Sequence, residues 1–300
     1  MNTTNPQQIN GKTRLVGVMG WPIEHSISPQ MHNAAFASLG LDWAYVPLRV
    51  EPSTVQQALK GLVALNFVGS NVTVPHKQAV MRYMDELSDA ARIIGAVNTI
   101  HIKDGKYCGF NTDADGFLNS LVEGGCQPKG MRVAVLGAGG AARAVVYALG
   151  QAGAVSVTVF NRTAERAAFL VDDLADVFPD SRLHFAPLTS EALSGFDGNV
   201  DLVVNTTSVG MSPHVNNCPW PDDVPIPTKA TFCDLVYTPL ETVFLARARA
   251  AGAAAIDGLG MLVHQGVSAF EQWTGLQPPA DVMRQACLQK LAMEDEEVTD

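Results

Sequence analysis

A glycine-rich segment in the middle of the chain has the spacing of a phosphate-binding turn. It reads Gly137-Ala138-Gly139-Gly140-Ala141-Ala142 after an apolar run, which fits the pattern G-x-G-x-x-G/A. In this pattern the first glycine allows a tight turn, and the second lets a pyrophosphate approach the backbone. The free N–H groups at the start of the next helix then face the phosphates. Because glycine spacing alone is a weak signal, a plain strand–helix turn is the alternative.

The residues that follow indicate which dinucleotide would bind. NAD sites usually place an Asp or Glu about 20 residues after the glycines, where it holds the ribose 2′-hydroxyl. This chain has no acid from Gly137 to Ala164 and instead carries Asn161-Arg162-Thr163, with Arg166 following. Guanidinium groups suit a dianionic 2′-phosphate, and two arginines four apart on a helix repel each other unless an anion lies between them. We therefore predict NADP, against the alternative of two solvated surface arginines.

Two serines near the N-terminus could bind a carboxylate. Ser28 stands directly before Pro29, which suits the first turn of a helix, and Ser26 stands two positions before Ser28. On extended chain two residues that are two apart point the same way, so we expect both hydroxyls beside a helix N-terminus. The alternative is that Ser28 only caps the helix.

Further polar clusters follow apolar runs. We expect a short strand over 71–74 whose one face carries Asn71 and Thr73, with Lys77 on a loop or at a helix start beyond it. Asn98 and Asp113 lie in two later clusters, 95–99 and 109–113. Such clusters are turn-formers by default, and a loop lysine is usually a solvated charge. None of them identifies a chemistry alone.

The elements that must position these residues alternate between strand and helix. The pattern predicts strands at 132–136, 156–160, 201–205, 232–235 and 253–256, with helices at 141–151, 164–178 and 240–251. Such a series forms βαβ units with right-handed crossovers, and the fold class is therefore α/β with a parallel sheet.

Composition narrows the class of protein further. The chain has 300 residues, which suggests two domains, and a net charge of −10, which disfavours nucleic acid and anionic membrane surfaces as partners. Its five cysteines form no CxxC pair, and its seven histidines have no metal-site spacing, so we expect reduced thiols and no metal. The polar N-terminus lacks the apolar core of a signal peptide, so we expect a cytoplasmic protein.

Together these segments resemble the shikimate/quinate dehydrogenase family, and its shikimate 5-dehydrogenases in particular. The motifs that carry the resemblance are Ser26-x-Ser28-Pro29, Asn71-Val-Thr-Val-Pro-x-Lys77, Gly95-Ala-Val-Asn98-Thr, Asn111-Thr-Asp113, Gly137-Ala-Gly-Gly-Ala, Asn161-Arg-Thr163 and Asp257-Gly-Leu-Gly-Met-Leu-x-x-Gln265. They span nearly the whole chain. Two positions depart from the family pattern: His76 stands where phenylalanine is common, and Ala114 stands where glycine is common.

The resemblance implies an activity and a fold. The activity is NADP-dependent interconversion of 3-dehydroshikimate and shikimate, in the synthesis of chorismate and aromatic amino acids. The fold is a Rossmann-type NADP-binding domain and an α/β substrate-binding domain, with the active site in the cleft between them. We expect residues 1–113 and 258–300 to form the discontinuous substrate domain and residues 114–257 to form the nucleotide domain.

The resemblance also implies the roles of individual residues. Lys77 and Asp113 would form the catalytic pair. The residues that would bind the substrate are Ser26, Ser28, Asn71, Thr73, Lys77, Asn98, Asp113, Tyr237 and Gln265. Those that would bind the cofactor are Gly137, Ala138, Gly139, Gly140, Ala141, Asn161, Arg162, Thr163, Arg166 and Gly258.

Two other functions compete with this interpretation. One is a quinate or dual quinate/shikimate dehydrogenase that uses NAD, which Arg162 and the missing acid disfavour. The other is a non-catalytic NADP-binding sensor on the same fold, which the presence of both Lys77 and Asp113 disfavours. For partners we expect a small-molecule substrate, no nucleic acid and no membrane, and a chain that is a monomer or a homodimer.

Overall fold

The computed structural model describes residues 9–196 and 199–299, the side chains of 294–299 excepted. The chain divides into two compact units, which we call unit 1 (Met1–Thr112 with Gly266–Asp300) and unit 2 (Asp113–Gln265). These limits differ from the expected ones at 113 and 257. The second limit falls inside a continuous helix whose first half packs in unit 2, since Gly260 lies against Ser120 of that unit. The assignment of a function to each unit stays a prediction.

Unit 1 is built on a six-stranded mixed sheet in the order β2-β1-β3-β5-β6-β4. Its strands are β1 (Arg14–Gly20), β2 (Trp43–Arg49), β3 (Phe67–Val72), β4 (Glu86–Leu87), β5 (Thr99–Lys103) and β6 (Lys106–Phe110). Strand β1 pairs in parallel with β2 and β3, whereas β5 is antiparallel to β3 and β6. The central strand β3 is buried along its whole length, as expected for a strand covered on both faces.

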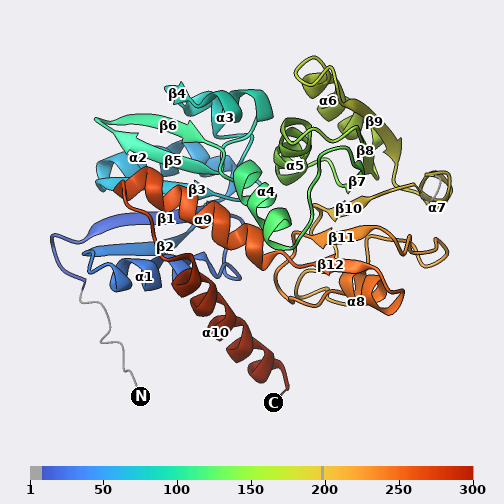
Figure 1. Cartoon of the computed structure of the whole chain (residues 1–300). Coiled ribbons are helices and arrows are strands. Elements are labelled where there is room, and N and C mark those ends of the chain that lie inside the picture. Colours follow the sequence, from blue (N-terminus) through green and yellow to red (C-terminus); the bar gives the residue numbers. More distant parts are fainter. Residues whose placement is uncertain (1–8, 197–198, 300) are drawn as a thin grey trace. The chain divides into compact units, whose positions relative to one another are not determined.

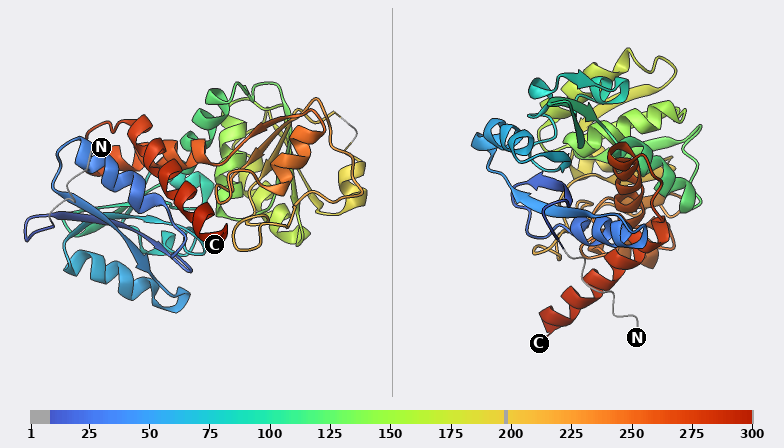
Figure 2. Two further views of the ribbon diagram at one scale, coloured as in Figure 1. Left: turned by 90° about the horizontal axis from the view of Figure 1, so that it is seen from below. Right: turned by 90° about the vertical axis from the view of Figure 1, so that its left-hand side faces the viewer.

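Helices α1 (Ser28–Ser38), α2 (Val55–Ala64), α3 (Asp89–Ile94) and α10 (Ala280–Thr299) belong to unit 1, together with the second half of α9 (Leu259–Thr274) and the 3₁₀ turns η1 (Pro52–Thr54) and η2 (Met81–Tyr83). Helix α10 packs along α1, so unit 1 combines elements from the first and the last part of the sequence (Figures 1 and 2). The core beneath α2 is formed by residues such as Leu59, Leu62 and Ile100.

Two local expectations in unit 1 are wrong. The strand expected at 71–74 is β3 at 67–72, so Thr73 lies just beyond it. The all-buried run from Phe67 to Val72 sets the strand. Ser28 is not extended either, because it is the first residue of α1 with Pro29 in the first turn. Proline there is pre-set for the helix.

Unit 2 is a parallel sheet with the order β12-β11-β10-β7-β8-β9. Its strands are β7 (Arg132–Leu136), β8 (Ser156–Asn161), β9 (Arg182–Pro187), β10 (Leu202–Asn205), β11 (Thr231–Asp234) and β12 (Ala254–Ile256). The chain runs outward from β7 through β8 and β9, then returns to the other side of β7 for β10. This is the doubly wound order, and its switch point lies between β7 and β10. The predicted α/β fold class with a Rossmann-type domain is confirmed.

The helices of unit 2 are α4 (Asp113–Glu123), α5 (Gly140–Gln151), α6 (Ala164–Ala175), α7 (Ser190–Ser194), α8 (Val243–Ala250) and the first half of α9. Helix α5 packs on β7 and β8, α6 on β8 and β9, and α8 on β11 and β12 (Figure 1). The helix expected at 240–251 begins later, because Thr242 caps α8 by accepting a hydrogen bond from the Leu245 N–H. The apolar core between these layers includes Phe160, Phe232 and Phe244.

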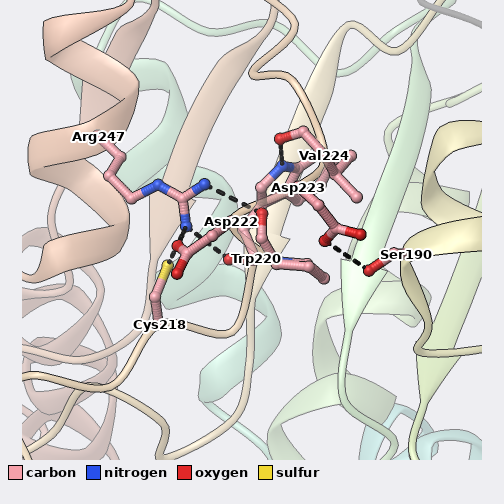
Figure 3. Close-up of polar contacts among 8 residues, drawn as sticks. Ser190, Cys218, Trp220, Asp222, Asp223, Val224 and Arg247 are labelled. Carbon is pink, nitrogen blue, oxygen red and sulfur yellow. Dashed lines mark hydrogen bonds and ion pairs between the residues drawn. The ribbon is translucent and has the colours of Figure 1, made fainter.

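A long segment connects β10 to β11, and one arginine of α8 fastens it (Figure 3). Arg247 donates from Nη1 to the Trp220 carbonyl at 2.7 Å and from Nη2 to the Pro221 carbonyl at 3.0 Å, and it pairs with the Asp222 carboxylate at 2.8 Å. Ser190, at the start of α7, donates to Asp223 at 2.7 Å. These contacts hold residues 220–223 against helices α7 and α8 of the same unit.

Among residues 9–196 and 199–299, none of the helices has both the length and the apolar character to cross a membrane.

Candidate functional site

The glycine-rich turn follows β7 at the carboxyl edge of the unit 2 sheet. Gly137 has φ +109°, a conformation that side-chain-bearing residues rarely adopt. A Cβ there would lie 2.7 Å from Thr206 Oγ1 and 2.9 Å from Thr207 Cγ2, so glycine is needed for packing as well as for the turn. The Thr206 hydroxyl donates to the Leu136 carbonyl at 2.7 Å, which seats the segment after β10 on this turn.

The second glycine of the turn leaves a space at the start of α5. A Cβ built at Gly139 would meet no atom within 4 Å, and no side chain caps the helix, whose first residue is Gly140. The first N–H groups of α5 are therefore free of a side-chain cap, as an anion site requires. Ala138 and Ala141 flank this space and are half-buried, while Ala142 is fully buried where α5 meets the sheet. The turn fits the pyrophosphate of a dinucleotide.

The two arginines predicted to hold a 2′-phosphate lie beyond β8. Arg162 follows Asn161 at the strand end, and Arg166 lies in the first turn of α6, and both are exposed. Arg162 therefore lies before the helix, as the predicted helix start at 164 implies, so the two arginines do not share one helical face. The Asn161 amide donates to the Thr163 carbonyl at 2.8 Å and shapes the turn between them. Neither guanidinium pairs with a carboxylate in the described part of the chain, so both can reach an anion.

Polar side chains at the ends of β10 and β11 form a second cluster in unit 2. The buried Asp234 carboxylate accepts from Asn205 Nδ2 at 2.9 Å and from Thr242 Oγ1 at 2.7 Å. It also accepts from the Val236 N–H at 3.0 Å. Burial raises the pKa of Asp234 to about 6, although these three hydrogen bonds act to lower it.

Two residues that the family resemblance assigned lie beside this cluster. Tyr237 is half-buried in the segment after β11. Gly258 precedes α9, and a Cβ there would lie 2.6 Å from the Leu235 carbonyl oxygen and 2.7 Å from that of Val236. Only glycine allows this approach, so Gly258 fixes the start of α9 against the segment that carries Tyr237.

In unit 1 the serines lie at the N-terminus of α1. Ser28 is buried and begins the helix, while Ser26 is half-buried before it. The Ser28 N–H donates to Ser26 Oγ at 3.4 Å, which brings the two residues together although the chain is not extended. Both hydroxyls lie at a helix start, where an anion is favoured.

Asn71 lies near the end of β3 in a buried hydrogen-bond network. The Tyr45 hydroxyl donates to Asn71 Oδ1 at 2.7 Å, and Asn71 Nδ2 donates to the Asn98 carbonyl at 3.1 Å and to Thr99 Oγ1 at 3.0 Å. Asn98 Oδ1 in turn accepts from the Thr112 N–H at 2.8 Å. The structure thus brings Asn71 and Asn98 together and orders the chain up to Thr112, directly before Asp113.

Two further residues predicted for the site, Thr73 and Lys77, follow Asn71 in the sequence. Thr73 is half-buried, with its N–H on the Met19 carbonyl at 2.9 Å. Lys77 is half-buried, and its carbonyl accepts from the Val97 N–H at 2.8 Å. His76 is buried, and its Nε2 lies 2.7 Å from the Val50 carbonyl, so this departure from the family pattern ties the Lys77 loop to the end of β2.

Asp113 and Gln265 belong to unit 2. Asp113 is buried and begins α4, where the helix dipole favours a carboxylate. Gln265 is half-buried on α9, and a Cβ at Gly116 would lie 2.8 Å from its backbone nitrogen. The glycine three positions after Asp113 therefore lets α4 approach α9. Because Lys77 lies in unit 1 and Asp113 in unit 2, their catalytic pairing stays a prediction.

Sequence reasoning missed Tyr45, Asn205, Asp234 and Thr242. Asn205 and Asp234 each end an apolar strand, which is where α/β sheets bind ligands, so a polar residue at a strand end was the available signal. Tyr45 had none, because its partner Asn71 is 26 positions away.

Family models match three stretches of the chain. They describe the shikimate dehydrogenase substrate binding domain at residues 18–100, shikimate / quinate 5-dehydrogenase at 122–208, and the shikimate 5′-dehydrogenase C-terminal domain at 258–288.

Relatives and solved structures match nearly the full length. The shikimate dehydrogenase (NADP⁺) of Desulforamulus reducens is 47% identical over 95% of this chain and 98% of its own. A crystal structure of a shikimate dehydrogenase in complex with NADP⁺ is 39% identical with a TM-score of 0.85, over 95% of this chain and 98% of its own. The Thermus thermophilus enzyme in complex with NADP(H) and shikimate is 40% identical with a TM-score of 0.81, over 92% and 99%. These matches cover both the glycine turn and the polar strand ends described above, and they show that this chain belongs to the shikimate dehydrogenase family.

Proposed function

We propose that this protein is an NADP-dependent shikimate dehydrogenase, which interconverts 3-dehydroshikimate and shikimate. The observation that carries the proposal is the turn after β7, where position 139 leaves room for a pyrophosphate in a chain of this family. The two exposed arginines after β8 support NADP as the cofactor.

When bound, NADPH supplies the hydride for carbonyl reduction. The chain's own residues bind the substrate and move the proton. The Lys77 ammonium donates a proton to the C3 carbonyl oxygen during reduction, and in the reverse direction the amine accepts it from the C3 hydroxyl. Asp113 orients Lys77 and accepts from a ring hydroxyl. Ser26 and Ser28 hold the substrate carboxylate at the start of α1.

Ring hydroxyls contact the other predicted residues. These are Asn71, Thr73, Asn98, Tyr237 and Gln265. The cofactor contacts residues 137–141 of the glycine turn, residues 161–163, Arg166 and Gly258. The five cysteines carry free thiols, which supports the cytoplasm as the compartment. A small-molecule substrate is the partner, and the chain acts as a monomer or a homodimer.

The assignment of Lys77 is tested by replacing it with alanine. Lys77→Ala should lower kcat by roughly 10²–10⁴, the usual contribution of a general acid–base group. It should leave NADP binding unchanged, because the cofactor residues lie in unit 2. Absorbance of NADPH measures turnover with shikimate and NADP. Lys60→Ala, at an exposed lysine of α2, is the matched control, and near-wild-type turnover in Lys77→Ala would contradict the role.

The cofactor preference is tested at Arg162. Arg162→Ala removes a guanidinium that would face the 2′-phosphate, so KM should rise about tenfold or more for NADP and hardly change for NAD. Arg182 is an exposed arginine at the amino end of β9 in the same sheet, so Arg182→Ala should change neither KM. An equal effect of Arg162→Ala on the two cofactors would refute a 2′-phosphate contact.

A further inference from the structure

The ends of β10 and β11 carry a buried carboxylate to which the proposed chemistry gives no task. Asp234 is fully buried, and its two oxygens receive three hydrogen bonds. Oδ1 accepts from Asn205 Nδ2 and from the Val236 N–H, and Oδ2 accepts from Thr242 Oγ1. The donors belong to three separate segments: the end of β10, the turn after β11 and the cap of α8. One side chain therefore ties three segments together.

Asn205 passes this restraint on to the segment after β10. Its Oδ1 accepts from the Thr207 N–H at 3.0 Å and from Thr207 Oγ1 at 2.7 Å. Thr207 Oγ1 in turn accepts from the Val209 N–H at 3.1 Å. The conformation of residues 205–209 thus depends on the orientation of the Asn205 amide. Asp234 fixes that orientation together with the Val209 carbonyl, which accepts from Nδ2 at 3.3 Å.

Both restrained segments lie at the carboxyl edge of the unit 2 sheet, where the cofactor is proposed to bind. Residues 205–209 rest on the glycine turn through Thr206, and residues 235–236 rest against Gly258. In a doubly wound sheet a dinucleotide lies across the switch point, here between β7 and β10. Its 2′-phosphate end belongs beside Arg162, after β8, so its nicotinamide end belongs on the β10–β11 side.

Stability alone does not account for a carboxylate at this place. Burial raises the pKa of Asp234 to about 6, above its ordinary value of 3.8. The protonated group stabilises the folded protein at low pH, and this contribution is lost as the pH rises through 6. At neutral pH the ionised form therefore lowers the free energy of unfolding. Its advantage is geometric, because two acceptor oxygens satisfy three donors that a single amide oxygen cannot reach.

We propose that Asp234 is a positioning residue for the reaction, which fixes segments 205–209 and 235–238 where the nicotinamide end of the cofactor and Tyr237 meet the substrate. This proposal rests on the proposed function. It assigns Asp234 no contact with substrate or cofactor, and its effect reaches them through the Asn205 amide and the Val236 backbone.

The test is a graded pair of variants at position 234. Asp234→Asn keeps the two hydrogen bonds to Oδ1 but can keep a contact with Thr242 only in the reversed direction, with its amide donating to Oγ1, and Asp234→Ala keeps none. We expect kcat/KM for shikimate to fall in that order, by about tenfold or more in Asp234→Ala, which corresponds to about 1.4 kcal/mol. Adenosine 2′,5′-bisphosphate, which lacks the nicotinamide, should bind both variants within twofold of wild type and gives the concentration of folded sites.

A second pair covers the case in which Asp234→Ala does not fold. Thr242→Val removes the donor to Oδ2 together with the cap on the Leu245 N–H at the start of α8, and Thr242→Ser keeps both. We expect Thr242→Val to lose several-fold in kcat/KM per bisphosphate-binding site, and Thr242→Ser to recover to within twofold of wild type. Ser181→Ala is the matched control, because Ser181 is a buried hydrogen-bonded residue at the opposite edge of the same sheet. It should lower Tm without changing kcat/KM.

The proposal is overturned if Asp234→Asn and Thr242→Val both keep wild-type kcat/KM per bisphosphate-binding site. It is also overturned if activity and bisphosphate binding fall in parallel, since a purely structural role predicts that result. Failure of the proposed function looks different, because the wild-type chain itself would then show no shikimate-dependent reduction of NADP.

Discussion

At the scale of single residues, Asn71 shows how the protein prepares a side chain for a ligand. Both N–H groups of its amide are used, one on the Asn98 carbonyl and one on Thr99 Oγ1, and Tyr45 occupies one lone pair of Oδ1. The capacity that remains is the second lone pair of Oδ1. If Asn71 contacts the substrate as proposed, it accepts a hydrogen bond from a hydroxyl and donates none.

A second residue, which stacks on Tyr45, affects how the protein responds to acid. His32 of α1 is fully buried and stacks on Tyr45, with ring centroids 4.3 Å apart and planes 4° apart. Neither ring nitrogen has a hydrogen-bond partner in the described part of the chain. Burial lowers the pKa of His32 to about 3, so the folded protein holds this ring neutral.

We expect this histidine to make unit 1 sensitive to acid. Between pH 6.5 and 3 the unfolded chain binds a proton at His32 that the folded chain does not bind. The free energy of unfolding therefore decreases as the pH is lowered, by up to about 1.4 kcal/mol per pH unit. His32→Phe removes the titrating group and should flatten the dependence of Tm on pH across this window. His184→Gln, at an exposed histidine of β9, should leave the dependence as it is. An unchanged slope in His32→Phe would contradict the assignment.

At the scale of elements, the β7–turn–α5 unit separates two reasons for glycine. Gly137 is required by the fold, because its φ is positive and Thr206 leaves no room for a Cβ. Gly139 is not required by the fold, because its backbone has φ −92° and ψ −171° and the space around it is open. That space is the place proposed for the pyrophosphate.

The two glycines should therefore respond differently to alanine. Gly139→Ala should change the free energy of unfolding by less than about 1 kcal/mol while raising KM for NADP about tenfold or more. Gly137→Ala should destabilise the protein by roughly 1–3 kcal/mol through backbone strain and the contact with Thr206. Tm and steady-state KM measure the two effects. A normal KM for NADP in Gly139→Ala would place the pyrophosphate elsewhere.

The elements also show how far the sequence alone could lead. The strands and helices of 132–175 were predictable, because apolar runs, glycines and helix periodicity agree there. The register of β3 was not, because a strand buried on both faces has no alternation to mark its end. The polar residues that end β10 and β11 were visible in the sequence, but their contact was not, since Asn205 and Asp234 are 29 positions apart and become neighbours only through the strand order.

At the scale of the whole molecule, the chain is acidic while its proposed ligands are anions. The net charge of −10 gives no broad attraction to a phosphate or a carboxylate. We propose that binding comes from local groups: the start of α1 with its serines, Lys77, the start of α5 and the two arginines after β8. On this proposal the local groups supply the affinity, and the long-range field of the protein does not.

Each unit has its own apolar core, so the cofactor should protect one unit first. The core around Phe160 and Phe232 lies entirely in unit 2, and the core around Leu59 and Ile100 lies entirely in unit 1. A ligand stabilises what it binds by mass action. Saturating NADP should slow amide hydrogen exchange in β7, α5 and β10 more than in β1–β3, as mass spectrometry can resolve by segment. Equal slowing in both units would contradict cofactor binding by unit 2 residues.

The aromatic cluster of unit 1 has an optical consequence. The Trp273 indole lies 6.1 Å from the Tyr45 ring and 5.6 Å from the His32 ring, and its N–H is fixed on the Ile100 carbonyl at 2.9 Å. Tyr45 in turn holds the Asn71 amide. The Trp273 fluorophore is thus connected through Tyr45 to Asn71, a proposed substrate contact. Its emission offers a label-free readout of shikimate binding before any cofactor is added.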